Sequence, residues 1–272
     1  MSVASAPFAA RLAAAAQEAR RQGVDALLVT PGPDLRYLVG YDAVPMERLT
    51  CLVIPAAGDP SVIVPGLEVL AAEASPVGSL GLPLHPWGET DDPFALTARV
   101  VGPVTTVALD DHMWAQKVLR LRAAMPESEQ VTGGAILERL RMRKDAAECE
   151  SLARAGAAID RVHAEVTGLI RVGRTEREVG RDIAELILAA GHASVDFIIV
   201  ASGPNGASPH HEVSDRVIEN GDQIVVDIGG TMPDGYRSDC TRTYSLGEPN
   251  DDYLHMYAAL KASQEAGCEA VR

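Results

Sequence analysis

The stretch VVDIGGTMPDGYRSDCTRTYS, residues 225–245, carries an aspartate on each side of a Pro-Asp-Gly turn. Asp227 lies six residues before Pro233, and Asp239 lies six residues after it. Tight turns prefer Pro, Asp and Gly, so the two flanking runs are predicted to form an antiparallel hairpin centred on Pro233. In that register the two carboxylates nearly face each other, because directly opposed side chains have Cβ atoms roughly 4.5 to 5.5 Å apart.

Two ionised carboxylates this close would repel each other and destabilise the sheet. A divalent cation between them removes the repulsion, and oxygen ligands suit Mn, Mg, Co or Zn. The alternative is a solvated hairpin whose acids point outward, which the apolar run IVVDIGG around Asp227 disfavours. From spacing alone both interpretations stay open, because two acids are a weak metal signal.

A second candidate region is the segment ASGPNGASPHHEVSD, residues 201–215, which is dense in Gly, Pro, Ser and Asn. Long irregular loops at strand ends commonly carry function. His210 and His211 are adjacent in this segment, and an imidazole near a metal could hydrogen-bond a substrate or a developing oxyanion. The plain alternative is that both histidines face water. That alternative is expected to hold for the other five, His85, His112, His163, His192 and His255.

The hydrophobic pattern predicts two kinds of architecture along the chain. The first part alternates strands with helices, which indicates an α/β domain. Its strands are expected at 24–30, 50–56, 61–65 and 105–110, and its helices at 6–22, 67–74, 93–101 and 113–124. The second part is expected to contain a helical stretch over 134–170 with a break near Lys144, a helix starting at a Thr175–Glu178 capping box, and strands at 195–202, 223–230 and 239–245.

The change of pattern predicts a domain boundary between residues 126 and 146. We therefore expect two domains, residues 1–130 and 131–272.

The composition excludes several classes of partner. A formal net charge of −14 argues against nucleic acid, whose phosphates require a basic face, and against an anionic membrane surface. No apolar run approaches the roughly 20 residues of a membrane span, and the N-terminal residues lack the pattern of a signal peptide. The four cysteines show no disulfide-like spacing. These features favour a cytoplasmic protein without membrane contact.

Three segments resemble one family. SGPNGASPHH (202–211) and GDQIVVDIGGTMPDGYRSDCTRTYSLGEP (221–249) resemble the Xaa-Pro peptidases, prolidase and aminopeptidase P, of the pita-bread metallopeptidase superfamily. VDALLVTPGPDLRYLVGYD (24–42) looks like the start of that family's creatinase-like N-terminal domain. LRMRKDAAECESLARAGAAID (140–160) looks like the helix that opens its catalytic domain. The resemblance implies an α/β N-terminal creatinase-like domain followed by an α+β pita-bread catalytic domain.

The resemblance also implies roles for three residues. The position matching Asp227 is a metal ligand, the position matching Asp239 bridges two metal ions, and His210 matches a histidine that contacts substrate and stabilises the transition state. The implied cofactors are two divalent ions, most often Mn, with Co or Zn as alternatives. By the resemblance, a metal-bridging hydroxide is expected to attack the carbonyl before proline in a peptide substrate. A homodimer is also implied.

The chain departs from this family in one respect. The family completes its site with a His and two Glu ligands well after the aspartate pair, whereas the sequence stops at Arg272 and its last stretch, 253–272, resembles a single amphipathic helix. We therefore expect only the first half of the pita-bread domain, in a fragment that is inactive by itself. Two functions stay open, a metal-dependent Xaa-Pro dipeptidase or aminopeptidase and a non-catalytic peptide-binding or interaction module on the same scaffold.

Overall fold

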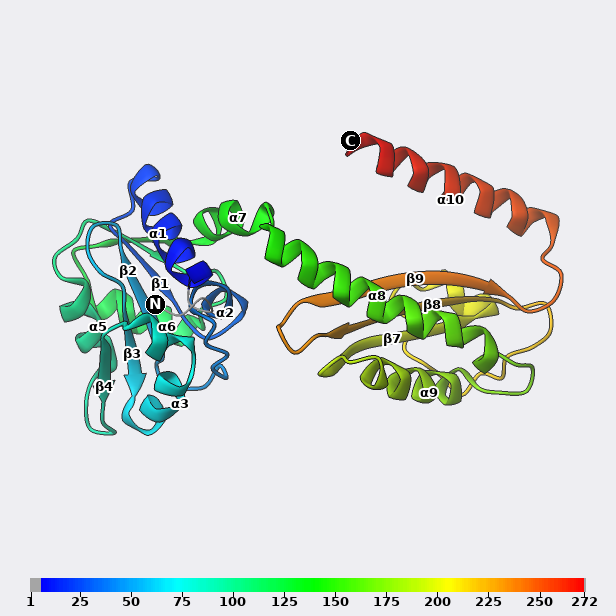
Figure 1. Cartoon of the computed structure of the whole chain (residues 1–272), viewed down its shortest axis with the longest axis horizontal. Helices are drawn as coiled ribbons and strands as arrows, with labels where there is room; N and C mark the ends of the chain where they lie inside the picture. Colours follow the sequence, from blue (N-terminus) through cyan, green and yellow to red (C-terminus); the bar gives the residue numbers. More distant parts are fainter. Residues whose placement is uncertain (1–5, 272) are drawn as a thin grey trace. The chain divides into compact units, whose positions relative to one another are not determined.

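The computed structural model describes residues 6–271, which form two compact units divided between Arg143 and Lys144 (Figure 1). The division falls after Arg143 rather than after residue 130, within the range where the pattern changes. The reason is helix α7 (Gly134–Met142), whose Ile136 and Leu137 are buried in the core of the first unit.

The first unit is an α/β domain, as the sequence predicts. Its six-stranded sheet has the order β4-β3-β2-β1-β5-β6, mixing antiparallel pairs (β1–β2, β2–β3) with parallel ones (β3–β4, β1–β5, β5–β6). The strands are β1 (Ala26–Val29), β2 (Cys51–Pro55), β3 (Ser61–Pro65), β4 (Leu84–Trp87), β5 (Thr106–Leu109) and β6 (Glu129–Thr132). Its other helices are α1 (Ala6–Arg21), α2 (Pro33–Val39), η2 (Gly66–Glu68), α3 (Val69–Ala74), α4 (Pro76–Leu80), α5 (Pro93–Val101) and α6 (Ala115–Ala124).

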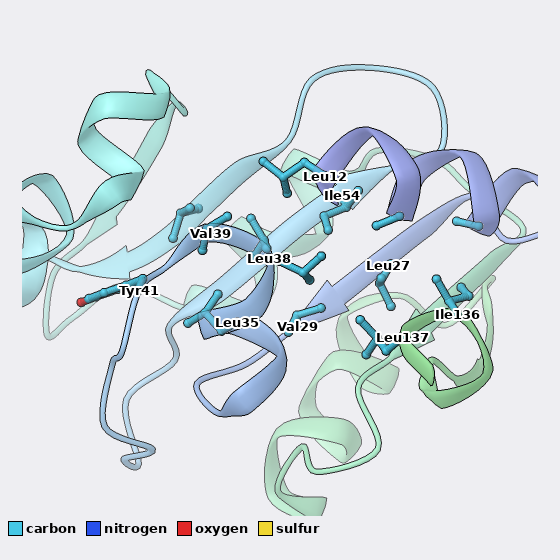
Figure 2. Packing of buried hydrophobic residues seen from close by; sticks show 14 of the residues in the cluster. Leu12, Leu27, Val29, Leu35, Leu38, Val39, Tyr41, Ile54, Ile136 and Leu137 are labelled. Atoms are coloured by element: carbon cyan, nitrogen blue, oxygen red, sulfur yellow. The ribbon is translucent and has the colours of Figure 1, made fainter. Parts of the chain in front are cut away.

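Both faces of this sheet are covered, which explains why its central strands are apolar throughout. Alternate residues of a strand point to opposite faces, and in β1 Leu27 packs in one core while Leu28 packs in the other. Figure 2 shows the first of these cores, where Leu27 and Val29 lie near Leu38 of α2. A strand buried on both faces reads as a continuous apolar run rather than an alternating one.

The second unit places two long helices against a three-stranded antiparallel sheet of order β7-β8-β9. Its elements are α8 (Ala146–Leu169), α9 (Glu176–Ala189), β7 (Ser194–Ser202), η3 (Gly203–Ala207), β8 (Gln223–Thr231), β9 (Arg237–Ser245) and α10 (Asp251–Ala270). Helix α9 begins at the predicted Thr175–Glu178 capping box, and α8 begins at a second box formed by Asp145 and Glu148. None of the helices in the described part of the chain combines the length and apolar character needed to cross a bilayer.

The β8–β9 hairpin forms as predicted, but its register differs from the prediction by two residues. Asp227 pairs with Thr241, and Asp239 pairs with Gly229, so the two aspartates are not directly opposed. The turn is a three-residue loop centred on Asp234, in which the Gly235 N–H bonds the Met232 carbonyl at 2.8 Å and Gly235 takes φ 87°. A type I turn followed by a left-handed glycine is a common three-residue hairpin connection.

Replacing Gly235 by alanine is expected to lower the free energy of unfolding by about 1 to 2 kcal/mol, because a Cβ disfavours positive φ. Denaturant unfolding followed by circular dichroism measures the change. The control is Gly156→Ala in the interior of α8, where an added Cβ meets nothing within 4 Å. That variant is expected to stabilise the protein by roughly 0.5 to 1 kcal/mol, so two effects of the same sign would contradict the turn described.

Candidate metal centre and histidine loop

The register brings Asp227 and Asp239 to the same face of the β8–β9 hairpin as diagonal neighbours. Gly229 is two residues from Asp227 and directly opposite Asp239, which fixes this relation. Diagonal neighbours lie roughly 7 Å apart, farther than directly opposed residues but within reach of a shared ion. Asp227 is half-buried and accepts a hydrogen bond from Thr241 Oγ1 at 2.6 Å, whereas Asp239 is exposed.

The two apolar residues adjacent to Asp227 in β8 lie on the other face of the sheet. Val226 and Ile228 are fully buried in the core beneath α8 and α9. Because side chains alternate along a strand, burying these two residues turns Asp227 and Gly229 away from the helices. The apolar run therefore reflects the covered face, and the carboxylates occupy the uncovered one.

The two carboxylates fit a divalent ion in kind and in position. Both are oxygen donors, and sites of this type often combine one or two carboxylates with water. Within residues 6–271, no group of three or more His, Cys, Asp or Glu side chains is arranged to hold a metal ion. Asp227 and Asp239 would therefore supply part of a ligand set rather than all of it.

The segment with the histidines follows β7, and its first turn lies against the face that carries the aspartates. It begins with η3, where an added Cβ on Gly206 would lie 3.7 Å from Val225 Cγ2. Val225 is two residues from Asp227 in β8, so the two side chains share a face. His210 is exposed, and the neighbouring His211 is half-buried, with its Nε2 donating to Glu176 Oε2 at 2.8 Å.

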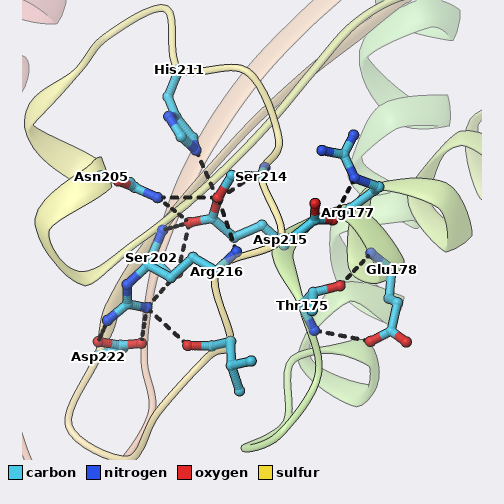
Figure 3. A network of polar contacts seen from close by, with 12 residues as sticks. Thr175, Arg177, Glu178, Ser202, Asn205, His211, Ser214, Asp215, Arg216 and Asp222 are labelled. Atoms are coloured by element: carbon cyan, nitrogen blue, oxygen red, sulfur yellow. Dashed lines mark hydrogen bonds and ion pairs between the residues drawn. The ribbon is translucent and has the colours of Figure 1, made fainter.

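Glu176 is a fully buried carboxylate that the sequence analysis did not select. It accepts hydrogen bonds from three groups at the start of the loop and three near its end, and Figure 3 labels the residues that donate them. Burial alone would raise the pKa of Glu176, but the hydrogen bonds from Ser214, Ser202 and Asn205 outweigh it and lower the pKa from 4.5 to about 2. The sequence signal was slight, since an acid after a Thr N-cap is ordinary in a first helical turn.

An ion pair between Arg216 and Asp222 is joined to this network through Ser202. Arg216 Nη1 and Nη2 donate to the two oxygens of Asp222 at 2.6 and 2.9 Å, and Nη1 also donates to Ser202 Oγ at 2.7 Å. Such two-pronged Arg–carboxylate contacts fix geometry as well as charge. The pair joins Ser202, at the end of β7, to the residue before β8.

The prediction that the other five histidines face water is wrong for two of them. His163 on α8 contacts the Cys240 carbonyl and Tyr244 Oη, each at 2.9 Å, and His192 contacts the Ile187 carbonyl at 3.0 Å and Ser238 Oγ at 2.8 Å. Both are about 95% buried, being 6% and 5% exposed. Buried polar groups need such partners, so these histidines hold helices to the sheet. His112 and His255 are exposed as predicted, and His85 is half-buried.

This two-unit fold and its aspartate-bearing hairpin are those of a metallopeptidase family. Residues 150–272 match the model of metallopeptidase family M24, and residues 11–143 match the creatinase/prolidase N-terminal domain. The chain belongs to metallopeptidase family M24, and its two domains are a creatinase-type N-terminal domain and the pita-bread domain of that family. Membership of this family implies a divalent metal cofactor.

Three relatives show how far the similarity extends. The chain is 49% identical to a probable dipeptidase, PepE, of Mycobacterium bovis, over 97% of this chain and 71% of the relative. It is 30% identical to an Xaa-Pro dipeptidase of Lactobacillus helveticus, over 88% of this chain and 66% of the relative. The crystal structure of dipeptidase PepE from Mycobacterium ulcerans superposes with a TM-score of 0.92 at 48% identity, covering 96% of this chain and 71% of that one.

The buried Glu176 should make the stability of the protein depend on pH in the acid range. A carboxyl whose pKa is lowered on folding contributes stability that is present above its unfolded value, here 4.5, and is lost as pH falls through about 2. The contribution is up to about 3 kcal/mol. Wild type should exceed Glu176→Gln in free energy of unfolding above pH 4.5, and the difference should shrink towards pH 2. A difference independent of pH in denaturant titrations would contradict this.

Proposed function

We propose that these residues serve metal-dependent hydrolysis of the bond between any residue and a following proline, in dipeptides or short peptides. The observation that supports this most directly is the shared face of the β7–β9 sheet. It carries Asp227 and Asp239, and the loop with His210 begins by folding over Val225 on the same face. Two metal-binding carboxylates and an exposed imidazole are among the groups that such a hydrolysis uses.

Each residue has a proposed role. Asp227 supplies a carboxylate to one divalent ion, and Asp239 supplies a carboxylate shared between two. When bound, the ions activate a water and polarise the scissile carbonyl. His210 donates a hydrogen bond to the substrate where negative charge develops, which is where a fixed donor lowers the barrier most. Manganese is the proposed metal, with cobalt or zinc as alternatives, because carboxylate oxygens accept all three.

The proposed substrate class follows from a relative and from the chemistry of proline. The Lactobacillus helveticus relative is an Xaa-Pro dipeptidase. The bond before proline has no N–H and its ring restricts φ, so a site for it cannot rely on the amide donor that other peptides offer. A homodimer in the cytoplasm stays a prediction from the sequence.

A second function is supported by the incomplete ligand set. The described residues offer no cluster of three metal-binding side chains, and a two-carboxylate site binds metal weakly. We therefore propose that the 272 residues by themselves bind a proline-containing peptide without hydrolysing it.

Replacing Asp227 or Asp239 by asparagine should abolish manganese binding, because each change removes a charged oxygen ligand. Isothermal titration of Mn²⁺ into each variant of the complete gene product measures this. Asp234→Asn is the matched control, since Asp234 lies at the tip of the same hairpin and contacts Arg154 Nη2 at 3.0 Å instead. If Asp239→Asn bound as many ions as wild type, the shared role of Asp239 would be lost.

Hydrolysis of Ala-Pro in the presence of Mn²⁺ tests the function itself. We expect release of free proline by the complete gene product and none by the 272-residue chain. Absence of hydrolysis by the metal-loaded gene product would refute the peptidase proposal. Turnover by the 272-residue chain would refute the proposal that its ligand set is insufficient.

A further inference from the structure

Beyond the groups that would touch substrate, we propose that Glu176 is a positioning residue for His210, which it holds through His211 and both ends of the loop. The inference rests on the proposed function in so far as His210 acts in it. Glu176 itself lies in the first turn of α9, outside the loop, and its side chain is fully buried.

One oxygen of Glu176 holds the start of the loop. Oε1 accepts hydrogen bonds from the Ser202 N–H and Oγ, each at 2.7 Å, and from Asn205 Nδ2 at 3.0 Å. Ser202 is the last residue of β7 and Asn205 lies in η3. The loop therefore leaves the sheet in a direction set by the carboxylate.

The other oxygen holds the residues that follow His210. Oε2 accepts from His211 Nε2 at 2.8 Å, from Ser214 Oγ at 2.6 Å and from the Ser214 N–H at 3.2 Å. Because an ionised carboxylate only accepts, His211 Nε2 carries a hydrogen. His210 is exposed, so its place is determined by the backbone, and its direct neighbour His211 is tied to Glu176 (Figure 3).

The contacts require a carboxylate rather than any polar group. Six donors converge on two oxygens, and a glutamine would turn its own NH₂ donor towards three of them. A buried donor left without an acceptor costs more than the bond itself contributes. Glutamine has the same size, so the Glu176→Gln change removes acceptors without opening a cavity.

Hydrogen exchange of the 272-residue chain tests the anchoring without any activity. In Glu176→Gln the Ser202 or the Ser214 amide, whichever the glutamine NH₂ faces, should exchange about 10- to 100-fold faster. The matched control is Glu178→Gln, two residues further along the same helix. In the wild-type protein, Glu178 Oε2 accepts a hydrogen bond from the Thr175 N–H. Because this contact involves neither Ser202 nor Ser214, both amides should exchange as in wild type. Unchanged exchange in Glu176→Gln would overturn the inference whether or not the protein is a peptidase.

Kinetics of the complete gene product test whether the anchoring serves His210. In Glu176→Gln, kcat for Ala-Pro should fall about 100-fold, with KM and Mn²⁺ affinity unchanged, because neither the metal ligands nor their strands are altered. His211→Gln keeps an N–H donor and should retain most of kcat, whereas His211→Leu should not. A fall in kcat no larger than in Glu178→Gln, or an equal loss in both His211 variants, would overturn the inference. An inactive wild type would instead refute the proposed function, and would remove the role for His210 while leaving the exchange result to stand.

His211→Leu also keeps the inference open to refutation if Glu176→Gln fails to fold. His211 lies at the edge of the network and is partly exposed, so its loss should leave the core intact. Faster exchange of the Ser214 amide in His211→Leu, without a change in the midpoint of unfolding, is the expected result. Wild-type exchange together with wild-type kcat would overturn the inference.

Discussion

The pairing register of the β8–β9 hairpin is the constraint on which the second unit depends. The three-residue loop Pro233-Asp234-Gly235 sets Asp227 opposite Thr241 and Asp239 opposite Gly229. Since side chains alternate, this same register sends Val226 and Ile228 into the core. A slip by one residue would exchange the two faces of β9 relative to β8. The pairing register therefore determines both the burial of the apolar face and the exposure of the carboxylates.

A second constraint is the way a buried charge is stabilised. Glu176 has no arginine or lysine among its described hydrogen-bond partners, which are hydroxyls, backbone N–H groups, an amide and an imidazole. Burial of an ionised carboxylate is costly unless such donors surround it. The donors stabilise the buried carboxylate, and the carboxylate in turn fixes the shape of the loop to which most of the donors belong. The result couples the start of α9 to the segment that carries His210.

Much of the fold could be predicted, and the two strands that were missed have a common cause. Apolar runs in the sequence predicted the four central strands, β1, β2, β3 and β5. The capping box at Thr175 predicted the start of α9. The strands that were missed, β4 and β6, lie at the two edges of the sheet. β4 contains Pro86 and β6 is a polar four-residue segment, so both owe their conformation to the neighbouring strand rather than to their own pattern.

By itself the sequence determined the α/β character of the first unit, the hairpin in the second, and the residues Asp227, Asp239 and His210 that resemble a metallopeptidase. These are local features, written in hydrophobic period, turn residues and motif spacing. Only the tertiary structure decided that the aspartates are diagonal, because register depends on which turn residue is central. It also decided the role of Glu176, since that carboxylate meets loop residues 26 to 38 positions away, and no local pattern records so distant a contact.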